Sequence, residues 1–180
     1  MDGNKAIFLD RDGTINKDKN YLHKISDFEY IEGAIDGLKI LSDMGYMLVV
    51  ITNQSGIARG FYLEQDYLDL DRWMKKDLSN KGIIIAGSYY CPHLPNGVVS
   101  QYTKECDCRK PKTGLFWKAV NDLKIDIQKS YAIGDKPRDL SICDESDVKG
   151  ILLSKVKCRS SNYTVCTCWN EIVEYIKSED

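Results

Sequence analysis

The sequence has little that would direct the protein to nucleic acid or to a membrane. Its 25 lysine and arginine residues are balanced by 27 aspartate and glutamate residues, so the formal net charge is −2. Without a basic excess, non-specific binding to nucleic acid or to a membrane surface is not expected. The longest apolar runs, 46–51 and 83–86, are far too short to span a bilayer. The first five residues include an acid and precede no long apolar segment, so we expect a cytoplasmic protein without a signal peptide.

Signatures of several other protein classes are missing from the sequence. It has no Gly-x4-Gly-Lys-Ser/Thr loop, which argues against a P-loop nucleotide hydrolase. Neither His23 nor His93 belongs to a serine- or cysteine-hydrolase signature. The seven cysteines are an odd number in a chain that is not expected to be secreted, so a disulfide framework is not predicted. Clustered cysteines in a reducing compartment are better interpreted as metal ligands or small core residues.

Short apolar segments alternate with amphipathic ones along the whole chain. Apolar strands that alternate with helices are typical of a parallel sheet covered on both faces. We therefore predict an α/β fold with a doubly wound, mostly parallel sheet. Because no repeat, low-complexity tract or Pro/Ser-rich linker interrupts the chain, we expect one domain over residues 1–180. Strands are expected at 5–10, 46–52, 83–91, 130–134 and 150–153, and helices at 35–44, 64–80, 113–124, 137–147 and from residue 169.

Polar residues follow three of these strands at the points where the strands end. The first strand leads into Asp10-Arg11-Asp12-Gly13, the second ends in Thr52, and the fourth leads into Gly134-Asp135 with Asp139 beyond. In a doubly wound fold these positions lie at the edge of the sheet where ligands bind. An isolated Asp-x-Asp-Gly suits a simple turn equally well, because Asp and Gly are both common in turns.

Taken together, these groups suit phosphoryl transfer. Carboxylates can hold a hard divalent cation, which offsets the negative charge of a phosphate under attack by an anionic nucleophile. A lysine such as Lys110 and a hydroxyl such as that of Thr52 can hold the remaining phosphate oxygens. A second carboxylic acid can protonate the departing alkoxide.

Four motifs in fixed order resemble those of the haloacid-dehalogenase-like phosphatase superfamily: Asp10-Arg11-Asp12-Gly13-Thr14, Thr52, Lys110, and Gly134-Asp135 with Asp139. The resemblance implies an aspartyl-phosphate mechanism in which Asp10 attacks phosphorus and Asp12 serves first as acid and then as base. It also implies that Thr52 and Lys110 stabilise the phosphoryl group and that Asp139 orients its neighbours. Mg2+ would then be bound by Asp10, by the backbone carbonyl of Asp12 and by Asp135.

A second group of residues surrounds the long irregular segment 92–111. Its pattern Cys-x-His, twelve residues, then Cys-x-Cys has the two-plus-two arrangement of a closed structural zinc site. The alternative is that the first cysteine is a core residue and the histidine belongs to a surface turn. A zinc-bound loop over 91–108 would fix the cations Arg109 and Lys110 that follow it. The expected Zn2+ ligands are Cys91, His93, Cys106 and Cys108.

Three further cysteines lie near the C-terminus at Cys158, Cys166 and Cys168. They raise the possibility of a second metal site, but no fourth ligand is evident nearby. The segment 165–168 fits a strand edge that leads into the last helix. The interpretation as core residues is therefore favoured over a metal site.

Residues 5–177 also resemble one branch of the superfamily: zinc-loop phosphatases that act on D-glycero-D-manno-heptose 1,7-bisphosphate, with their relatives the histidinol-phosphate phosphatases. The matching stretches are 8–14, 52–60, 89–93 and 106–111. No large cap is inserted after Asp12 or Thr52, so short loops must form the pocket walls. The substrate-binding residues implied by the resemblance are Asp18, Lys19, Asn20, Tyr21, Asn53, Gln54, Ser55, Arg109 and Lys136.

The choice between the two substrates depends on charge. A bisphosphate keeps one phosphate after cleavage, and Arg59, Arg109 and Lys136 are spare cations that could bind it. Histidinol phosphate would instead need acidic or aromatic walls, for which Asp18 and Asp107 are candidates. We favour the heptose bisphosphate and keep histidinol phosphate as the alternative. A catalytically silent sugar-phosphate-binding module is a third possibility, and in each case we expect a monomer with a small-molecule partner.

Overall fold

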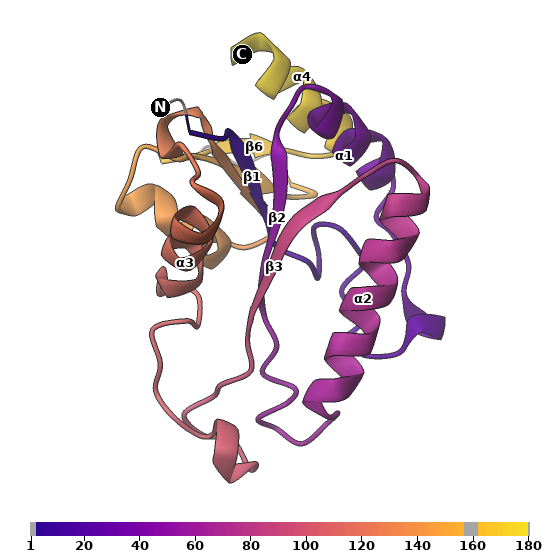
Figure 1. Cartoon of the computed structure of the whole chain (residues 1–180), viewed down its shortest axis with the longest axis vertical. Helices are drawn as coiled ribbons and strands as arrows, with labels where there is room; N and C mark the ends of the chain where they lie inside the picture. Colours follow the sequence, from indigo (N-terminus) through magenta and orange to yellow (C-terminus); the bar gives the residue numbers. More distant parts are fainter. Residues whose placement is uncertain (1–2, 157–161, 180) are drawn as a thin grey trace.

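A single parallel sheet forms the centre of the protein in the computed structural model shown in Figure 1, which describes residues 3–156 and 162–179. Its six strands run in the order β3-β2-β1-β4-β5-β6, and every described pair is parallel. This order confirms the doubly wound, mostly parallel α/β fold. The strands are β1 (Ala6–Leu9), β2 (Met47–Asn53), β3 (Ile85–Cys91), β4 (Tyr131–Gly134), β5 (Lys149–Leu153) and β6 (Thr164–Cys166).

Helices lie between the strands, close to the positions that the sequence predicts. The predicted helix 64–80 matches α2 (Glu64–Asn80). The helices α1 (Ala34–Asp43) and α3 (Gly114–Leu123) begin and end within one residue of the prediction, and α4 (Trp169–Glu179) begins at the predicted residue. The structure adds the short 3-10 helices η1 (Ile25–Asp27), η2 (Ser100–Tyr102) and η3 (Ile127–Lys129).

The helix predicted over 137–147 was wrong in type and in length, because the structure has the 3-10 helix η4 (Pro137–Asp144) there. At its end the Ile142 carbonyl accepts hydrogen bonds from the Glu145 N–H and from the Ser146 hydroxyl. The Ile142 carbonyl thus bonds to the N–H three residues later and to a side chain instead of to the N–H four residues later. The hydrogen-bond pattern of an α-helix therefore does not continue.

The sheet is buried on both faces by helices. Along β1, Ile7 and Leu9 face one apolar cluster, while Ala6 and Phe8 face the other, as the two-residue period of a strand requires. The first cluster includes side chains of α1, α2 and α4, and the second includes those of α3 and η4. Two-sided burial explains why the strands are continuously apolar rather than alternating with polar residues.

The strand order brings three chain segments together at one end of the sheet. Because β1 lies between β2 and β4, Leu9 is paired with Val50 on one side and with Ile133 on the other. The residues that follow these strands therefore begin next to one another. The long segment between β3 and α3 also extends beyond the sheet at this end (Figure 1).

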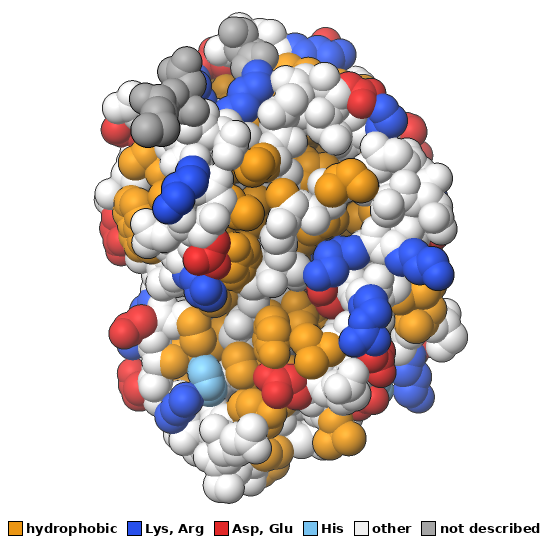
Figure 2. Space-filling model, in the orientation of Figure 1, with side chains coloured by type: hydrophobic (Ala, Val, Ile, Leu, Met, Phe, Trp, Pro, Cys, Tyr) orange, Lys and Arg blue, Asp and Glu red, His pale blue; other side chains and the backbone are white. Residues whose placement is uncertain are grey.

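Charged side chains of both signs lie on the surface (Figure 2), as expected from the nearly equal numbers of acidic and basic residues. Figure 2 shows acidic and basic side chains interspersed around exposed apolar ones on the face in view. Within residues 3–156 and 162–179, no helix has both the length and the apolar character needed to cross a membrane.

The indole of Trp169 connects the last helix to the loop that follows β1. The side chain is 1% exposed, and its Nε1–H donates a 3.0 Å hydrogen bond to the Thr14 carbonyl. It packs so closely on α1 that a Cβ added to Gly37 would lie 2.5 Å from the ring. This contact therefore supports the Asp-x-Asp-Gly loop from behind.

We expect Trp169→Ala to lower the free energy of unfolding by about 3–5 kcal/mol, because it empties a core position and removes the hydrogen bond to the loop. Urea unfolding measures the change. The control Lys177→Ala, on the exposed side of the same helix, is expected to change stability by less than about 0.5 kcal/mol. Equal losses for the two variants would contradict the packing role of the indole.

Candidate active site

A pocket of about 260 Å³ lies at the end of the sheet where β1, β2 and β4 finish. Its walls come from the ends of these strands, from the loop after β1, from the segment after β2, from the start of η4 and from the segment between β3 and α3. Most of the lining side chains are polar or charged, which suits a polar ligand. They are Asp10, Asp12, Asp18, Asn20, Tyr21, Thr52, Asn53, Gln54, Ser55, Arg59, Tyr62, Arg109, Lys136, Arg138 and Asp139.

A buried ammonium group joins two carboxylates beneath this pocket. Lys110 Nζ lies 2.7 Å from Asp10 Oδ1 and 2.7 Å from Asp139 Oδ1, and it donates a third bond of 2.7 Å to the Ile51 carbonyl. Its side chain is only 1% exposed. Burial alone would lower the pKa of Lys110, but the two carboxylates outweigh burial and raise it, so the group stays charged.

The environment of Asp10 differs from that of an ordinary surface carboxylate. Burial raises its pKa to about 7, with Lys110 acting in the opposite direction and Asp139 adding to the increase. Such a carboxylate lacks the water that would stabilise its charge, so a further cation beside it is favourable.

Asp135 supplies a second observation that points to a cation. One oxygen each of Asp10, Asp135 and Asp139 lie within 4.8 Å of one another. Asp135 Oδ1 is buried and has no hydrogen-bond partner, and burial raises the pKa of this side chain. The carboxylate packs against Gly13, whose φ of +95° and missing Cβ permit this approach, since a Cβ there would lie 2.4 Å from Oδ2.

This all-oxygen set fits a hard cation such as Mg2+. Two of these three carboxylates, Asp10 and Asp135, are also among the Mg2+ ligands that the sequence resemblance implies. Both oxygens of Asp139 are already occupied, one by Lys110 and the other by the backbone N–H of Lys136 at 3.0 Å. Asp139 therefore fits better as a group that orients its neighbours than as a metal ligand.

Asp12 is held at the pocket by hydrogen bonds from three side chains. Arg11 Nη2 lies 3.0 and 2.8 Å from its two oxygens, Asn16 Nδ2 donates at 2.9 Å, and Gln54 Nε2 donates at 3.0 Å. The Arg11 guanidinium is fully buried, and the same nitrogen also donates to the Leu22 carbonyl at 3.1 Å. The carboxylate is thus fixed in orientation while 22% of its side chain surface stays exposed.

Two residues predicted to bind substrate are largely committed to protein groups. The Asn53 amide accepts from the Lys110 N–H and donates to the Lys110 carbonyl, both at 3.0 Å. It therefore clamps the backbone of the buried lysine to the end of β2. Gln54 is 2% exposed and hydrogen-bonded at both ends of its amide.

The loop 18–21 contributes three of its four predicted residues to the pocket. Asn20 and Tyr21 have positive φ values of 53° and 64°, a conformation that is sparsely populated outside glycine and recurs at functional sites. Asp18 accepts from the Asn20 N–H and lies 3.4 Å from Lys136 Nζ. Lys19, the fourth predicted residue, is not part of the pocket lining, and its exposed ammonium lies 3.3 Å from Glu29 Oε2.

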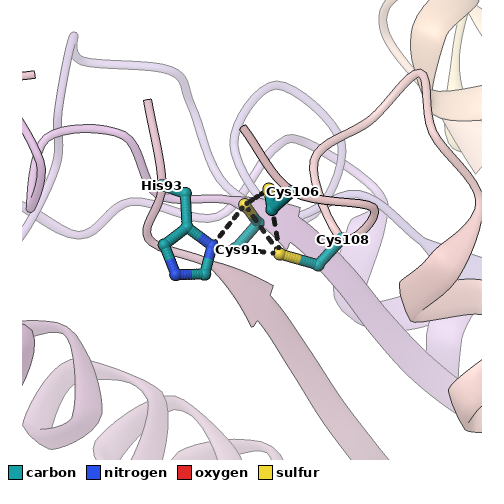
Figure 3. A group of neighbouring side chains, drawn as sticks. All are labelled: Cys91, His93, Cys106 and Cys108. Atoms are coloured by element: carbon teal, nitrogen blue, oxygen red, sulfur yellow. Dashed lines mark hydrogen bonds between the residues drawn. The ribbon is translucent and has the colours of Figure 1, made fainter. Parts of the chain in front are cut away.

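The four predicted zinc ligands come together at the end of β3 (Figure 3). The three sulfur atoms lie 3.1, 3.3 and 3.6 Å from one another, and His93 Nδ1 lies 3.2 Å from Cys108 Sγ and 3.8 Å from Cys91 Sγ. None of these cysteines is in a disulfide. Ligands about 2.3 Å from a tetrahedral zinc ion would have sulfur atoms about 3.8 Å apart, so a small expansion would admit the ion.

The chemistry of this cluster also suits zinc. Burial raises the pKa of the Cys91 thiol, which a cation would reverse. Burial, together with Lys104, lowers the pKa of His93, so its imidazole is neutral and able to act as a ligand. Arg109 follows the last cysteine, lines the pocket, and has Nη1 3.4 Å from the His93 carbonyl.

The C-terminal cysteines do not form a second cluster among the described residues. Cys166 is buried in the core beside β5, as predicted, whereas Cys168 is exposed and the core interpretation was wrong for it. Cys158 lies outside the described residues.

Sequence reasoning missed two pocket residues, Tyr62 and Arg138. Arg138 lies between Asp135 and Asp139, so its position beside the acidic motif was an available signal. Tyr62 follows the 52–60 stretch and has no local feature that distinguishes it from a packing aromatic residue.

Comparison with known proteins agrees with this geometry. Residues 5–147 match the sequence model of a family described as polynucleotide kinase 3 phosphatase. D-glycero-beta-D-manno-heptose-1,7-bisphosphate 7-phosphatase from Haemophilus ducreyi is 51% identical over 82% of this chain and 81% of its own length. D-glycero-alpha-D-manno-heptose-1,7-bisphosphate 7-phosphatase from Photorhabdus laumondii subsp. laumondii is 46% identical over 84% of this chain and 82% of its own length.

A solved structure is also similar. The crystal structure of D,D-heptose 1,7-bisphosphate phosphatase from B. bronchiseptica, complexed with magnesium and phosphate, superimposes with a TM-score of 0.83. It is 25% identical, and the match covers 98% of this chain and 99% of that one.

The parallel sheet and its strand order are those of the haloacid-dehalogenase-like phosphatase class, as the sequence resemblance implied. Within this class, the chain belongs to the family of the D-glycero-D-manno-heptose-1,7-bisphosphate 7-phosphatases.

We expect Lys110→Met to destabilise the protein by about 3–5 kcal/mol at pH 8, because it leaves Asp10 and Asp139 buried without their cation. The pKa of Asp10, which burial already raises, would then rise further above its unfolded value, because Lys110 no longer acts in the opposite direction. Carboxyl groups with raised pKa values hold protons more tightly in the folded state, so stability is lost as the pH rises and the deficit should be smaller at pH 5. Urea unfolding at both pH values without added divalent cations measures this.

The exposed pair of Lys118 with Asp122 supplies a control, since Lys118→Met should change stability by less than about 0.5 kcal/mol at either pH. A Lys110→Met deficit that does not depend on pH would contradict the electrostatic explanation.

Proposed function

We propose that the protein is a Mg2+-dependent phosphatase that removes the 7-phosphate of D-glycero-D-manno-heptose 1,7-bisphosphate through an aspartyl-phosphate intermediate. The single observation that carries this proposal is the buried pair of Asp10 and Lys110 at the base of a polar pocket, in a chain about half identical to named heptose bisphosphate phosphatases. The catalytic unit is proposed to be one domain over residues 1–180.

In the first half of the reaction, a carboxylate oxygen of Asp10 attacks phosphorus, and the bond from phosphorus to the C7 oxygen breaks. The Asp12 carboxyl gives its proton to the departing oxygen, which leaves as the C7 hydroxyl. The hydroxyl of Thr52 and the ammonium of Lys110 stabilise the charge on the phosphoryl group. The pocket position of Asp12 and Thr52 supports these roles.

In the second half, a water molecule attacks phosphorus while Asp12 accepts its proton. The bond from phosphorus to Asp10 then breaks, which restores the carboxylate and releases inorganic phosphate. Asp10, the backbone carbonyl of Asp12, and Asp135 would hold Mg2+. When bound, this ion supplies positive charge against the phosphate oxygens.

The charges around the pocket support a bisphosphate substrate. Arg59, Arg109 and Arg138 line it in addition to Lys136, so several cations are available for the phosphate that is not cleaved. The acids that would favour histidinol phosphate are less suitable. Asp18 is close to Lys136, and Asp107 is exposed outside the pocket lining, next to Lys112. Lys19 is not part of the proposed substrate site.

We also propose that Cys91, His93, Cys106 and Cys108 bind one structural Zn2+. Four protein ligands leave no open position for a substrate, so the ion would act on the fold of the loop rather than on the reaction. Its effect would reach the active site through Arg109 and Lys110, which follow the last ligand directly in the sequence.

Phosphate release from purified protein tests the activity. We expect Mg2+-dependent turnover of one or both anomers of the heptose bisphosphate, with a kcat/KM at least about tenfold above that for histidinol phosphate. Asp10→Asn should lower kcat by at least about 10³-fold, since it removes the nucleophile. Asp144→Asn, an exposed acid outside the pocket lining, is the matched control and should retain normal turnover.

A higher kcat/KM for histidinol phosphate would contradict the substrate assignment while leaving the mechanism in place. Inert wild-type protein across a broad panel of phosphate esters would instead favour the silent binding module.

Metal analysis tests the zinc site. We expect about one zinc per chain, lost in Cys106→Ser, together with a clear fall in phosphatase activity because the loop that carries Lys110 is no longer fixed. The control Cys168→Ser changes an exposed cysteine outside the cluster and should retain both zinc and activity. Full zinc occupancy in Cys106→Ser would contradict the assigned ligand set.

A further inference from the structure

The side-chain amide of Gln54 connects two pocket residues with different proposed roles. Asp12 is proposed to protonate the leaving oxygen, and Thr52 is proposed to bind the phosphoryl group. Its Nε2 donates to Asp12 Oδ2 at 3.0 Å and to Thr52 Oγ1 at 2.9 Å. Its Oε1 accepts a 2.6 Å hydrogen bond from the Tyr62 hydroxyl. Both amide hydrogens and the carbonyl oxygen are thus occupied by protein groups, and the residue is 2% exposed.

We propose that Gln54 is a positioning residue that holds Asp12 and Thr52 in their working orientations, and that Tyr62 fixes the orientation of its amide. This inference rests on the proposed phosphatase function. It replaces the sequence-based expectation that Gln54 binds substrate directly.

The hydrogen bond from Tyr62 determines which end of the amide faces Asp12. If the amide were rotated by half a turn, its oxygen would face the Asp12 carboxylate and its NH2 group would face the hydroxyl. Burial raises the pKa of Tyr62, so the hydroxyl keeps its proton and remains a donor to Oε1. The ring is itself fixed, because it is 6% exposed and stacked on His23 with centroids 4.9 Å apart.

For Asp12, Gln54 is the neutral donor on the oxygen that Asn16 does not contact. Asn16 donates to Oδ1 and Gln54 to Oδ2, while the Arg11 guanidinium is shared between the two oxygens. Among the residues that the structure describes, removing the Gln54 donor leaves Asp12 Oδ2 with the shared guanidinium as its one hydrogen-bond donor. The carboxylate then gains rotational freedom, and its alignment with the leaving oxygen is reduced.

For Thr52, the effect concerns the direction of the hydroxyl hydrogen. A hydroxyl has one hydrogen to donate and two acceptor lone pairs. Because Gln54 Nε2–H occupies one lone pair, the hydrogen of Thr52 stays available for a phosphoryl oxygen. One amide therefore orients both the proton-transfer group and a phosphate-binding group without contacting substrate itself.

The variants Tyr62→Phe and Gln54→Leu test this assignment. Tyr62→Phe removes only the hydroxyl and keeps the ring on His23. The matched control is Tyr90→Phe, which removes a tyrosine hydroxyl bonded to Glu64 at 2.7 Å, outside the pocket lining. Each protein is assayed with Mg2+ on the heptose bisphosphate and on 4-nitrophenyl phosphate, whose departing anion needs no proton. Urea unfolding midpoints report whether each variant is folded.

We expect the rate of the first turnover on the sugar phosphate to fall about tenfold in both variants, with KM within about twofold of wild type. The fall for 4-nitrophenyl phosphate should be only about threefold, because it reflects Thr52 and not protonation of the leaving group. Tyr90→Phe should match wild type with both substrates. If Gln54→Leu does not fold, Tyr62→Phe alone decides.

Two results would overturn the inference. One is a raised KM with an unchanged rate of the first turnover, which marks a direct substrate contact. The other is that the rate of the first turnover changes by the same factor for both substrates or changes for neither. Failure of the proposed phosphatase function can be distinguished from failure of this inference. In the former case the wild-type protein itself would lack Mg2+-dependent turnover of both substrates.

Discussion

The ammonium of Lys110, buried between Asp10 and Asp139, is the group on which the rest of the site depends. Two carboxylates at this depth would repel each other and lose hydration, and a single cation 2.7 Å from each offsets both costs. The arrangement leaves Asp10 as a carboxylate with a pKa near 7 and little water around it, which suits a nucleophile that needs further positive charge from its ligand. Asp139 fixes Lys110 through one carboxylate oxygen and the start of η4 through the other.

Because Lys110 lies in an irregular segment, other parts of the fold must hold it in place. Asn53 at the end of β2 is hydrogen-bonded to both the N–H and the carbonyl of Lys110. Cys108, the last residue of the Cys/His cluster, lies two residues before Lys110 in the sequence. β3 ends at Cys91, which is paired with Asn53 on the neighbouring strand β2. The Asn53 hydrogen bonds and the Cys/His cluster therefore both start from the adjacent ends of β2 and β3. A zinc ion in this cluster would thus stabilise the position of the buried Lys110 through a loop whose other anchor, Asn53, is already part of the sheet.

Much of this could be predicted from the sequence because the signals are local. The two-residue alternation of buried side chains in β1, the helical spacing of Trp169, Ile172 and Ile176, and the Cys-x-His and Cys-x-Cys pairs are all visible without tertiary information. The differences concern the type of one helix and the placement of single side chains. The helix after β4 is a 3-10 helix that ends at Asp144, Lys19 pairs with Glu29 and is not part of the pocket lining, and Cys168 is exposed rather than buried.

The order of the motifs determined the class of the protein, since strand-end carboxylates, a hydroxyl and a lysine in that order suit one chemistry. The roles of Asn53 and Gln54 were decided only by the tertiary structure. Their sequence positions, directly after Thr52, imply pocket residues, and both do line the pocket. What they bond to depends on Lys110, 57 residues away from Asn53 along the chain, and on Asp12, 42 residues away from Gln54. A hydrogen bond between such distant residues is a property of how the strands pack, which no local pattern records.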